Sequence, residues 1–258
     1  MKYVIANWKM NLSVRESVAL VRASLQAVQG RDQFPGIVLC PSATALSEAH
    51  KLLTRTHVKL GAQNAGPDRA GAYTGEIGIA QLEDVGCTYA IIGHSERRIR
   101  FGEADAVVHD RLMAVLASTL TPVLCVGESS EVREAGKQVA YVLKQLKLAL
   151  ANQKIPRGKQ LIVAYEPIWA IGSGSPATPA QAMEMHVAIR EFLASEYKLT
   201  GERVAVVYGG SVDSKNAYQF LRESEIDGLL VGGASIKAQE FAKILTAACD
   251  VVEAQDSV

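Results

Sequence analysis

The stretch RVAVVYGGSVDSKNAYQFLRESEIDGLLVGG, residues 203–233, contains two copies of one pattern. An almost continuous apolar run ends in Gly209 and Gly210, a segment of helical character follows, and a second apolar run ends in Gly232 and Gly233. Uninterrupted apolar runs are typical of parallel strands that are buried on both faces. The stretch therefore predicts a strand, a helix and a second parallel strand.

Six similar apolar runs precede this stretch, and segments with helical periodicity separate them. The runs are YVIANWK from residue 3, GIVLCP from 36, VKLGAQN from 58, TYAIIGH from 88, TPVLCVGE from 121 and LIVAYEP from 161. Eight strand–helix units without a linker predict an α/β protein with one domain, residues 1–258, folded as a closed (β/α)8 barrel. An open doubly wound sheet is the alternative, because alternation alone does not show closure.

Capping signals mark the starts of two predicted helices. Ser13 and Glu16 have the spacing of a capping box, and we expect that helix to stop at Gly30. A later helix is expected to open with a second capping box of Thr178 and Gln181, with Pro179 at its first position. For the first helix, the apolar residues expected on one face are Val14, Val18, Val21, Leu25 and Val28.

The composition limits the partners and the compartment. The 27 basic and 27 acidic side chains cancel, so neither a nucleic-acid nor a membrane-surface role is expected. The start of the chain, MKYVIANWKMNL, is too polar for a signal peptide. The four cysteines are scattered without a C-x-x-C pair, which favours reduced thiols and a cytoplasmic location. They are Cys40, Cys87, Cys125 and Cys249.

A barrel of this kind carries its active site at the carboxyl ends of its strands, where this chain has unusual polar residues. Asn7 and Lys9 lie two apart, on one face of a strand end. Lys9 either meets an anion or extends to solvent from a strand end. His94 is either a catalyst or a structural hydrogen-bonding group. Glu166 follows LIVAY, where burial disfavours the charged carboxylate and makes it a useful base.

Glu166 has a structural alternative, an ion pair with Arg97, Arg98 or Lys9. Ser95 lies in GHSER, which lacks the last glycine of a nucleophile elbow, so we do not expect a serine nucleophile.

The glycine pairs predict a phosphate site, because bare backbone N–H groups after the last two strands approach an anion closely. Gly172, Gly174 and Ala177 also match a dinucleotide fingerprint, but about a dozen residues (167–178) separate that strand from its helix, too many for such a site. The motifs H-E-x-x-H, C-x-x-C and G-x-x-x-x-G-K-[ST] do not occur. We therefore expect neither a metal nor a cofactor.

Eight motifs together resemble the triosephosphate isomerase family across essentially the whole chain, in order. They are ANWKMN (6–11), GAQN (61–64), GAYTGE (71–76), IIGHSERR (91–98), TPVLCVGE (121–128), AYEPIWAIGSG (164–174), YGGSV (208–212) and LVGGAS (230–235). The resemblance implies cofactor-free interconversion of dihydroxyacetone phosphate and D-glyceraldehyde 3-phosphate, in glycolysis and gluconeogenesis. Another phosphate-binding sugar isomerase or epimerase would share the glycines but not these motifs together. An inactive scaffold would not need Lys9, His94 and Glu166.

The resemblance also implies a role for each matching residue. Glu166 would be the base, His94 the electrophile that polarises the carbonyl oxygen, a role for which this family is a standard example, and Lys9 would stabilise the enediolate. Asn7 would hydrogen-bond the substrate. Glu96 and Ser95 would hold neighbouring groups in place. The phosphate would rest on backbone N–H groups of Gly172, Ser211, Gly232 and Gly233.

A lid and a dimer loop are implied in the same way. Residues 71–76 would join a homodimer, with Tyr73 and Thr74 on the loop and Thr74 near the neighbouring subunit's Asn7 and Lys9. Cys125 would pack near the base. Ser175 and Pro176 depart from the family pattern, as does Ser173, and a proline at the end of the lid would alter its motion. The lid would comprise Pro167, Ile168, Trp169, Ala170, Ile171, Gly172, Ser173, Gly174, Ser175, Pro176 and Ala177.

Overall fold

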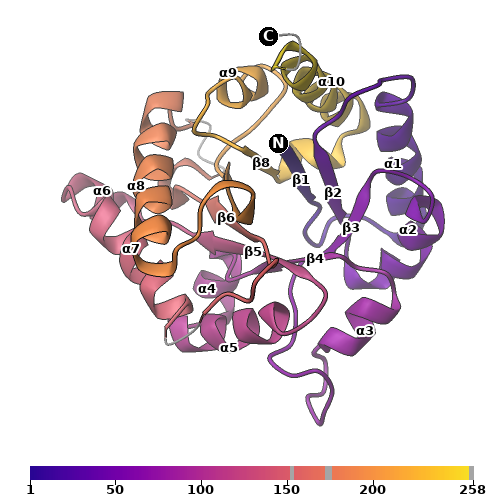
Figure 1. Cartoon of the computed structure of the whole chain (residues 1–258). Coiled ribbons are helices and arrows are strands. Elements are labelled where there is room, and N and C mark those ends of the chain that lie inside the picture. The colour runs from indigo at the N-terminus through magenta and orange to yellow at the C-terminus, as the bar shows by residue number, and fades with distance from the viewer. Residues whose placement is uncertain (152–153, 172–175, 256–258) are drawn as a thin grey trace.

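In a computed structural model of the chain, which describes residues 1–151, 154–171 and 176–255, the strands close into a barrel (Figure 1). All neighbouring strands are parallel, and β1 pairs with β8, with Tyr3 opposite Gly228. The predicted barrel is confirmed, and the open sheet is wrong. The strands are β1 (Tyr3–Asn7), β2 (Gly36–Cys40), β3 (Lys59–Ala62), β4 (Tyr89–Ile92), β5 (Thr121–Val126), β6 (Leu161–Tyr165), β7 (Val204–Tyr208) and β8 (Gly228–Val231).

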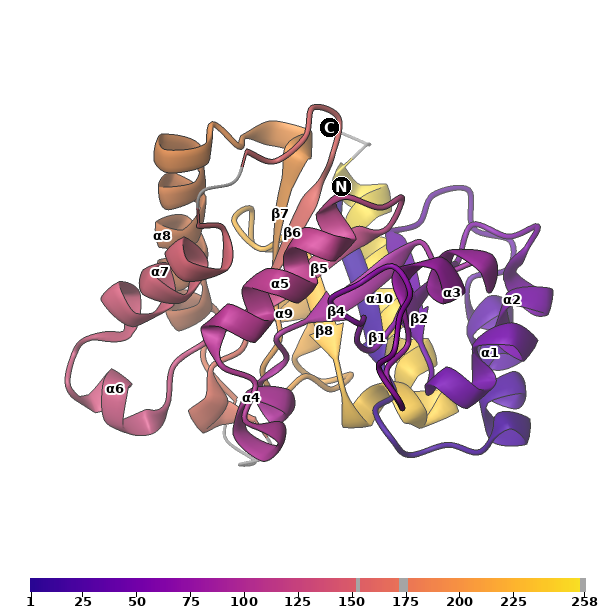
Figure 2. The ribbon, with the colours of Figure 1, turned by 90° about the horizontal axis from the view of Figure 1, so that it is seen from below.

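Helices surround the barrel on its outside (Figure 1). The short helices α4 and α6 lie at one end of the barrel, and the N-terminus lies at the opposite end (Figure 2). Among the described residues, no helix has the length and apolar composition needed to cross a membrane. The helices are α1 (Val14–Ala27), α2 (Leu46–Leu53), α3 (Ile79–Asp84), α4 (Ser95–Phe101), α5 (Asp105–Leu116), α6 (Ser130–Glu134), α7 (Gln138–Ala149), α8 (Pro179–Tyr197), α9 (Ala217–Leu221) and α10 (Ala238–Gln255).

Two apolar layers hold the fold together. One fills the inside of the barrel, and the other lies between the strands and the helices. Because side chains alternate along a strand, one strand supplies both layers: Ile5 belongs to the inner layer, whereas Val4 and Ala6 belong to the outer one. This double burial explains why the strands read as continuous apolar runs in the sequence.

Both predicted capping boxes form. Ser13 Oγ accepts a 3.3 Å hydrogen bond from the Glu16 N–H, and Glu16 Oε2 accepts a 2.9 Å bond from the Ser13 N–H. Thr178 and Gln181 make the equivalent pair of bonds at the start of α8. These contacts satisfy N–H groups that have no partner within the helix.

The predicted buried face and end of α1 are wrong in part. The helix ends at Ala27, before Gly30, and Val14 is 37% exposed. The prediction counted apolar residues only, and so it missed buried serines. Ser24 is buried at little cost because its hydroxyl donates a 2.8 Å hydrogen bond to the Leu20 carbonyl, one turn earlier. The residues buried along α1 are Ser17, Leu20, Val21 and Ser24.

Candidate active site

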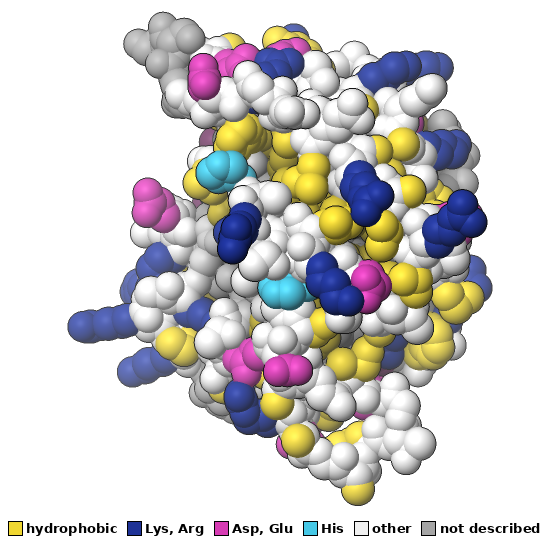
Figure 3. All heavy atoms as spheres, turned by 90° about the vertical axis from the view of Figure 1, so that its right-hand side faces the viewer, with side chains coloured by type: hydrophobic (Ala, Val, Ile, Leu, Met, Phe, Trp, Pro, Cys, Tyr) yellow, Lys and Arg dark blue, Asp and Glu magenta, His cyan; other side chains and the backbone are white. Residues whose placement is uncertain are grey.

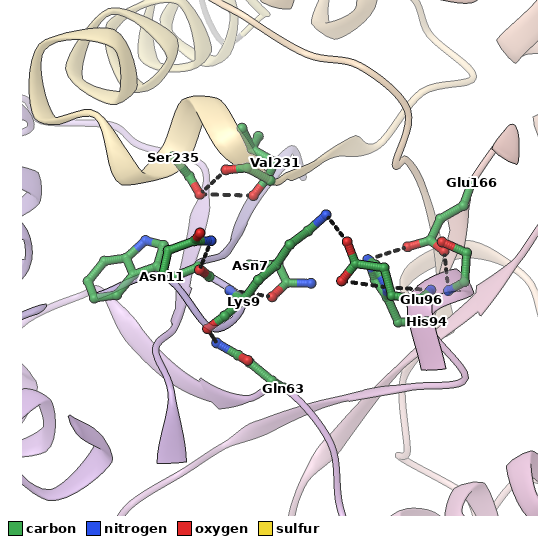
Figure 4. A network of polar contacts seen from close by, with 12 residues as sticks. Asn7, Lys9, Asn11, Gln63, His94, Glu96, Glu166, Val231 and Ser235 are labelled. Carbon is green, nitrogen blue, oxygen red and sulfur yellow. Dashed lines mark hydrogen bonds and ion pairs between the residues drawn. The ribbon is translucent and has the colours of Figure 1, made fainter. Parts of the chain in front are cut away.

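Lys9 follows β1 in a backbone conformation that lysine rarely adopts. Its φ is +53°, in the left-handed region, which costs a non-glycine residue roughly 1–2 kcal/mol. Three hydrogen bonds hold it there. Asn7 Oδ1 accepts from the Lys9 N–H at 3.1 Å, and Gln63 Nε2 donates to the carbonyls of Lys9 (2.8 Å) and Cys40 (2.9 Å). The turn therefore fixes the direction in which the lysine side chain leaves β1 (Figure 4).

The Lys9 side chain extends toward α4, where it meets Glu96. Lys9 Nζ lies 2.7 Å from Glu96 Oε1, and both side chains are partly exposed. Burial raises the pKa of Glu96, but the hydrogen bond and charge of Lys9 outweigh it, so the pKa is lowered overall. Glu96 is therefore ionised at neutral pH and holds the lysine cation at the mouth of the barrel.

His94 caps the N-terminus of α4 through its ring. The Glu96 N–H donates a 3.2 Å hydrogen bond to His94 Nδ1, so Nδ1 is an acceptor. In a neutral imidazole the proton then lies on Nε2, an assignment made from this hydrogen bond. Nε2 lies 3.1 Å from Glu166 Oε1. The ring therefore presents a donor toward the carboxylate that follows β6.

Glu166 is 1% exposed, and one of its two carboxylate oxygens has a clear donor. Oε2 accepts a 2.8 Å hydrogen bond from the Ser95 N–H, at the start of α4. Oε1 lacks a hydrogen bond from the described residues, although His94 Nε2 lies 3.1 Å away. One oxygen is thus anchored, and the other is free to react.

The structural alternative for Glu166, an ion pair with a neighbouring cation, is wrong. Each proposed partner pairs with a different carboxylate: Lys9 with Glu96, Arg97 with Glu103, and Arg98 with Asp105.

A cavity of about 340 Å³ is lined by Lys9 and His94, and Glu166 lies next to it through its contact with His94. Two glycines leave it open. A Cβ at position 209 would lie 2.9 Å from Glu166 Cγ, and one at position 232 would lie 3.3 Å from Lys9 Cε. Side chains there would displace the charged groups. The residues lining the cavity are Asn7, Lys9, His94, Ile171, Gly209, Gly210, Ser211, Val212, Leu230, Gly232, Gly233 and Ala234.

The two ends of the predicted lid are tied to the barrel by contacts that the sequence analysis missed. Glu128 Oε1 accepts hydrogen bonds from Tyr165 Oη (2.9 Å), Trp169 Nε1 (2.9 Å) and Arg133 (3.3 Å). At the far end, the Ala177 N–H donates a 3.2 Å bond to Tyr208 Oη. Glu128 follows β5, and Tyr208 is the last residue of β7. Their place at strand ends was the one feature of the sequence that pointed to a role for them.

The described part of the lid is residues 167–171 and 176–177. Residues Ile168–Ala170 form a short 3-10 turn, and Pro176 is exposed. Four residues of the lid lie outside the described residues: Gly172, Ser173, Gly174 and Ser175. They include Gly172, whose N–H is predicted to bind the phosphate, and both glycines of the dinucleotide-like motif.

The loop of residues 71–76 does not line this cavity. Arg111 holds its base through two hydrogen bonds to the Glu76 carboxylate, at 2.8 and 2.9 Å. Tyr73 is 51% exposed, and Thr74 is exposed as well. The loop therefore presents its tip away from the cavity of its own chain.

Comparison with known proteins agrees along nearly the whole chain. The family model described as triosephosphate isomerase matches residues 2–248. Triosephosphate isomerase of Aquifex aeolicus is 44% identical over 244 residues, which are 95% of this chain and 98% of the relative. That of Endomicrobium trichonymphae is 43% identical over 239 residues, covering 93% and 95%.

A solved structure agrees as well. The crystal structure of triosephosphate isomerase from Bartonella henselae superposes with a TM-score of 0.84 at 33% identity, covering 98% of this chain and 99% of that one. With sequence and structure in accord over almost every residue, the chain belongs to the triosephosphate isomerase family of enzymes.

Proposed function

We propose that this protein interconverts dihydroxyacetone phosphate and D-glyceraldehyde 3-phosphate through an enediolate, without a cofactor, in glycolysis and gluconeogenesis. One observation carries the proposal. A buried carboxylate with one open oxygen lies 3.1 Å from the His94 imidazole, and this imidazole and the Lys9 side chain line one cavity together with glycine-rich backbone.

Glu166 is the base in this proposal. Its open Oε1 takes a proton from the carbon next to the carbonyl, and the electron pair of the broken C–H bond forms the C=C bond of the enediolate. The Ser95 N–H keeps Oε2 in place during the transfer. Return of the same proton to the other carbon completes the isomerisation, so the carboxylate ends as it began.

His94 and Lys9 act on the oxygens of the substrate. The His94 Nε2–H donates to the carbonyl oxygen, whose negative charge grows as the enediolate forms. The Lys9 ammonium stabilises the same charge, an effect that is largest in a site from which water is excluded. The Asn7 side chain, which already holds the Lys9 backbone, adds a hydrogen bond to the substrate.

The phosphate binds on the glycine-rich wall of the cavity. Ser211, Gly232 and Gly233 line that wall, and their backbone N–H groups are the proposed donors to the phosphate oxygens, together with the N–H of Gly172. Amide groups at such turns bind anions without a side-chain charge. The ammonium of Lys9 then remains available for the enediolate.

The lid of residues 167–177 closes over the bound substrate. Ile171, at the end of its described first part, already lines the cavity. Closure excludes water and so protects the enediolate from losing its phosphate. Pro176 restricts the backbone at the far end of the lid, and we expect it to change the rate of opening and closing rather than the chemistry.

A coupled isomerase assay on Glu166→Asp tests the role of the base. The shorter side chain withdraws the carboxylate by about 1 Å, which costs roughly 100-fold in turnover. Titration with inorganic phosphate should show unchanged binding. Glu196→Asp, the same change at an exposed position on α8, is the control and should keep full activity. Equal activity of Glu166→Asp and the wild type would refute Glu166 as the base.

We also propose a homodimer formed through residues 71–76, in the cytoplasm. The exposed tip of the loop and the rigid base that Arg111 gives it support an insertion into a second subunit, with Thr74 near the partner subunit's Asn7 and Lys9. The four cysteines are free and buried, as suits a reducing compartment. Thr74→Arg should give inactive monomers in analytical ultracentrifugation. A fully active wild-type monomer would contradict the dimer.

A further inference from the structure

A second cavity lies on the outside of the barrel, away from the catalytic residues. Its volume is about 630 Å³, roughly twice the 340 Å³ of the catalytic cavity and within the usual range for small-molecule sites. It is bounded by the C-terminal half of α1, the chain from α1 into β2, and the chain from α2 into β3. None of its lining residues belongs to the catalytic cavity.

The floor of this cavity, which we call the α1–α2 cavity, is apolar and partly aromatic. Pro35, Ile37 and Val58 are buried beneath it. The rings of Phe34 and His57 lie side by side, with centroids 4.9 Å apart and planes tilted by 38°. Two rings in this arrangement offer a surface against which a flat ring system packs.

The rim of the α1–α2 cavity is cationic. Arg22, Arg31 and Arg55 line it, and none of the described lining residues carries a carboxylate. Asp250 and Glu253 on α10 neutralise Arg31. Arg22 and Arg55 are exposed, and neither has a hydrogen-bond or ion-pair partner in the described part of the chain. Two guanidinium groups are thus available beside an apolar floor.

The surface view agrees with this arrangement. Figure 3 faces the side of the barrel formed by α1 and α2, where hydrophobic side chains gather between basic and histidine side chains. Because the net charge of the whole chain is zero, an acid-free rim of arginines is a local feature and does not reflect a generally basic protein.

We propose that the α1–α2 cavity binds a small amphiphilic organic anion: a flat ring system bearing a carboxylate, sulfonate or phosphate group. The rings pack on Phe34 and His57 while the anionic group pairs with Arg22 and Arg55. Guanidinium groups suit this role because they bind the oxygens of such anions through two parallel hydrogen bonds. The site is independent of the isomerase reaction proposed above.

Fluorescence titration with anilinonaphthalene sulfonate tests this proposal, because the probe carries a ring system and one anionic group and brightens in apolar surroundings. We expect saturable binding with one site per chain. The double variant Arg22→Glu, Arg55→Glu should raise the Kd by about tenfold or more, because it places carboxylates where the sulfonate binds. Phe34→Ala should weaken binding about fivefold by removing the ring surface.

Two controls make the test specific. The double variant Lys144→Glu, Arg157→Glu changes the net charge equally at exposed positions outside the cavity and should leave the Kd unchanged. N-phenylnaphthylamine, the same ring system without the sulfonate, should bind at least about tenfold more weakly and ignore the arginine changes. Isomerase activity should be the same in all these variants.

Three results would overturn the proposal. The first is equal affinity for the charged and neutral probes, which would make the cavity a general apolar surface. The second is equal loss of affinity in both double variants, which would mean that only the net charge matters. The third is displacement of the probe by inorganic phosphate with the same midpoint in the wild type and in the variant Arg22→Glu, Arg55→Glu, which would place the probe in the catalytic cavity.

Discussion

Glu128 and Glu166 are the same residue type at the ends of neighbouring strands, yet their surroundings differ. Both are buried, with exposed fractions of 0% and 1%. Three side-chain donors from Tyr165, Trp169 and Arg133 share one oxygen of Glu128. Glu166 receives one backbone N–H instead. Each carboxylate keeps a second oxygen without a hydrogen bond from the described residues, Oε2 in Glu128 and Oε1 in Glu166, and the open oxygen of Glu166 lies 3.1 Å from His94 Nε2. The number of donors and the neighbour of the open oxygen, rather than burial, thus separate a carboxylate that holds structure from the proposed base.

Gly127, which precedes Glu128, packs directly against the backbone of Glu166. A Cβ at this position would lie 1.7 Å from the Glu166 carbonyl oxygen, so any side chain would push the strand ends apart. The Gly127 N–H donates a 2.8 Å hydrogen bond to Gln145 Oε1 on α7, which fixes the contact from outside. Gly127, the neighbour of Glu128, therefore helps to position Glu166, the proposed base.

Glu166→Gln should have the largest effect, and it should fall on the rate. Removing a positioned general base lowers kcat by about 10²–10⁴-fold. The free energy of unfolding should change by less than about 1 kcal/mol, because the amide keeps the shape of the side chain and removes a poorly solvated charge. A coupled isomerase assay and urea unfolding measure the two quantities. A destabilised but active variant would reverse the assignment of the two carboxylates.

Glu128→Gln should show the opposite pattern. Loss of the charge weakens three hydrogen bonds and leaves Arg133 less well paired, so we expect a loss of about 2 kcal/mol in the free energy of unfolding. The rate should fall by less than about tenfold, because the open oxygen of Glu166 is untouched. The same two measurements apply. A drop in kcat as large as that of Glu166→Gln would show that Glu128 is not only a structural residue.

The sequence predicted most of the fold, but not the difference between the surroundings of Glu128 and those of Glu166. Apolar runs and capping residues predict strands and helix starts because these depend on neighbours along the chain. Donors to a carboxylate come from other units: Ser95 reaches Glu166 across 71 positions, and Tyr165 reaches Glu128 across 37. The sequence marked Glu166 and Glu128 at strand ends, but no local pattern reveals which oxygen stays open. The strained turn at Lys9 and its hydrogen bonds from Gln63 were missed for the same reason.

His186, which packs near Tyr165, allows a test of stability at low pH. Its ring lies edge-on to Tyr165, the donor to Glu128, at 6.1 Å. Burial lowers its pKa to about 3, helped by the charges of Arg190 and Lys2, although its hydrogen bond to the Glu225 carbonyl opposes the shift. The unfolded chain therefore binds a proton that the folded chain does not, between about pH 6.5 and 3.

Stability should consequently fall as the pH drops below 6.5, by up to about 1.4 kcal/mol for each pH unit from this group. Urea unfolding at a series of pH values measures the slope. His186→Gln should flatten it over that range, whereas replacing His109, a partly buried histidine on α5, should not. Identical slopes for the wild type and His186→Gln would show that other groups set the acid limit.

Tyr208→Phe should have the smallest effect, and it concerns the far end of the lid. The change removes the acceptor of the Ala177 N–H, a bond worth about 1 kcal/mol, and keeps the ring stacked on Phe220. We expect kcat/KM to fall about fivefold, with little change in the free energy of unfolding. An unchanged kcat/KM would mean that the Glu128 end alone controls the lid.

Because β1 pairs with β8, the cavity can form only when both ends of the chain have been synthesised. Asn7 and Lys9 leave the ribosome among the first residues, whereas Gly232 and Gly233 leave among the last, and both groups line one cavity. The cation and the backbone groups that we propose to hold a triose phosphate therefore meet only after about nine-tenths of the chain has been made. A growing chain therefore has no complete site. During refolding, the recovery of activity reports the pairing of β1 with β8 that closes the barrel.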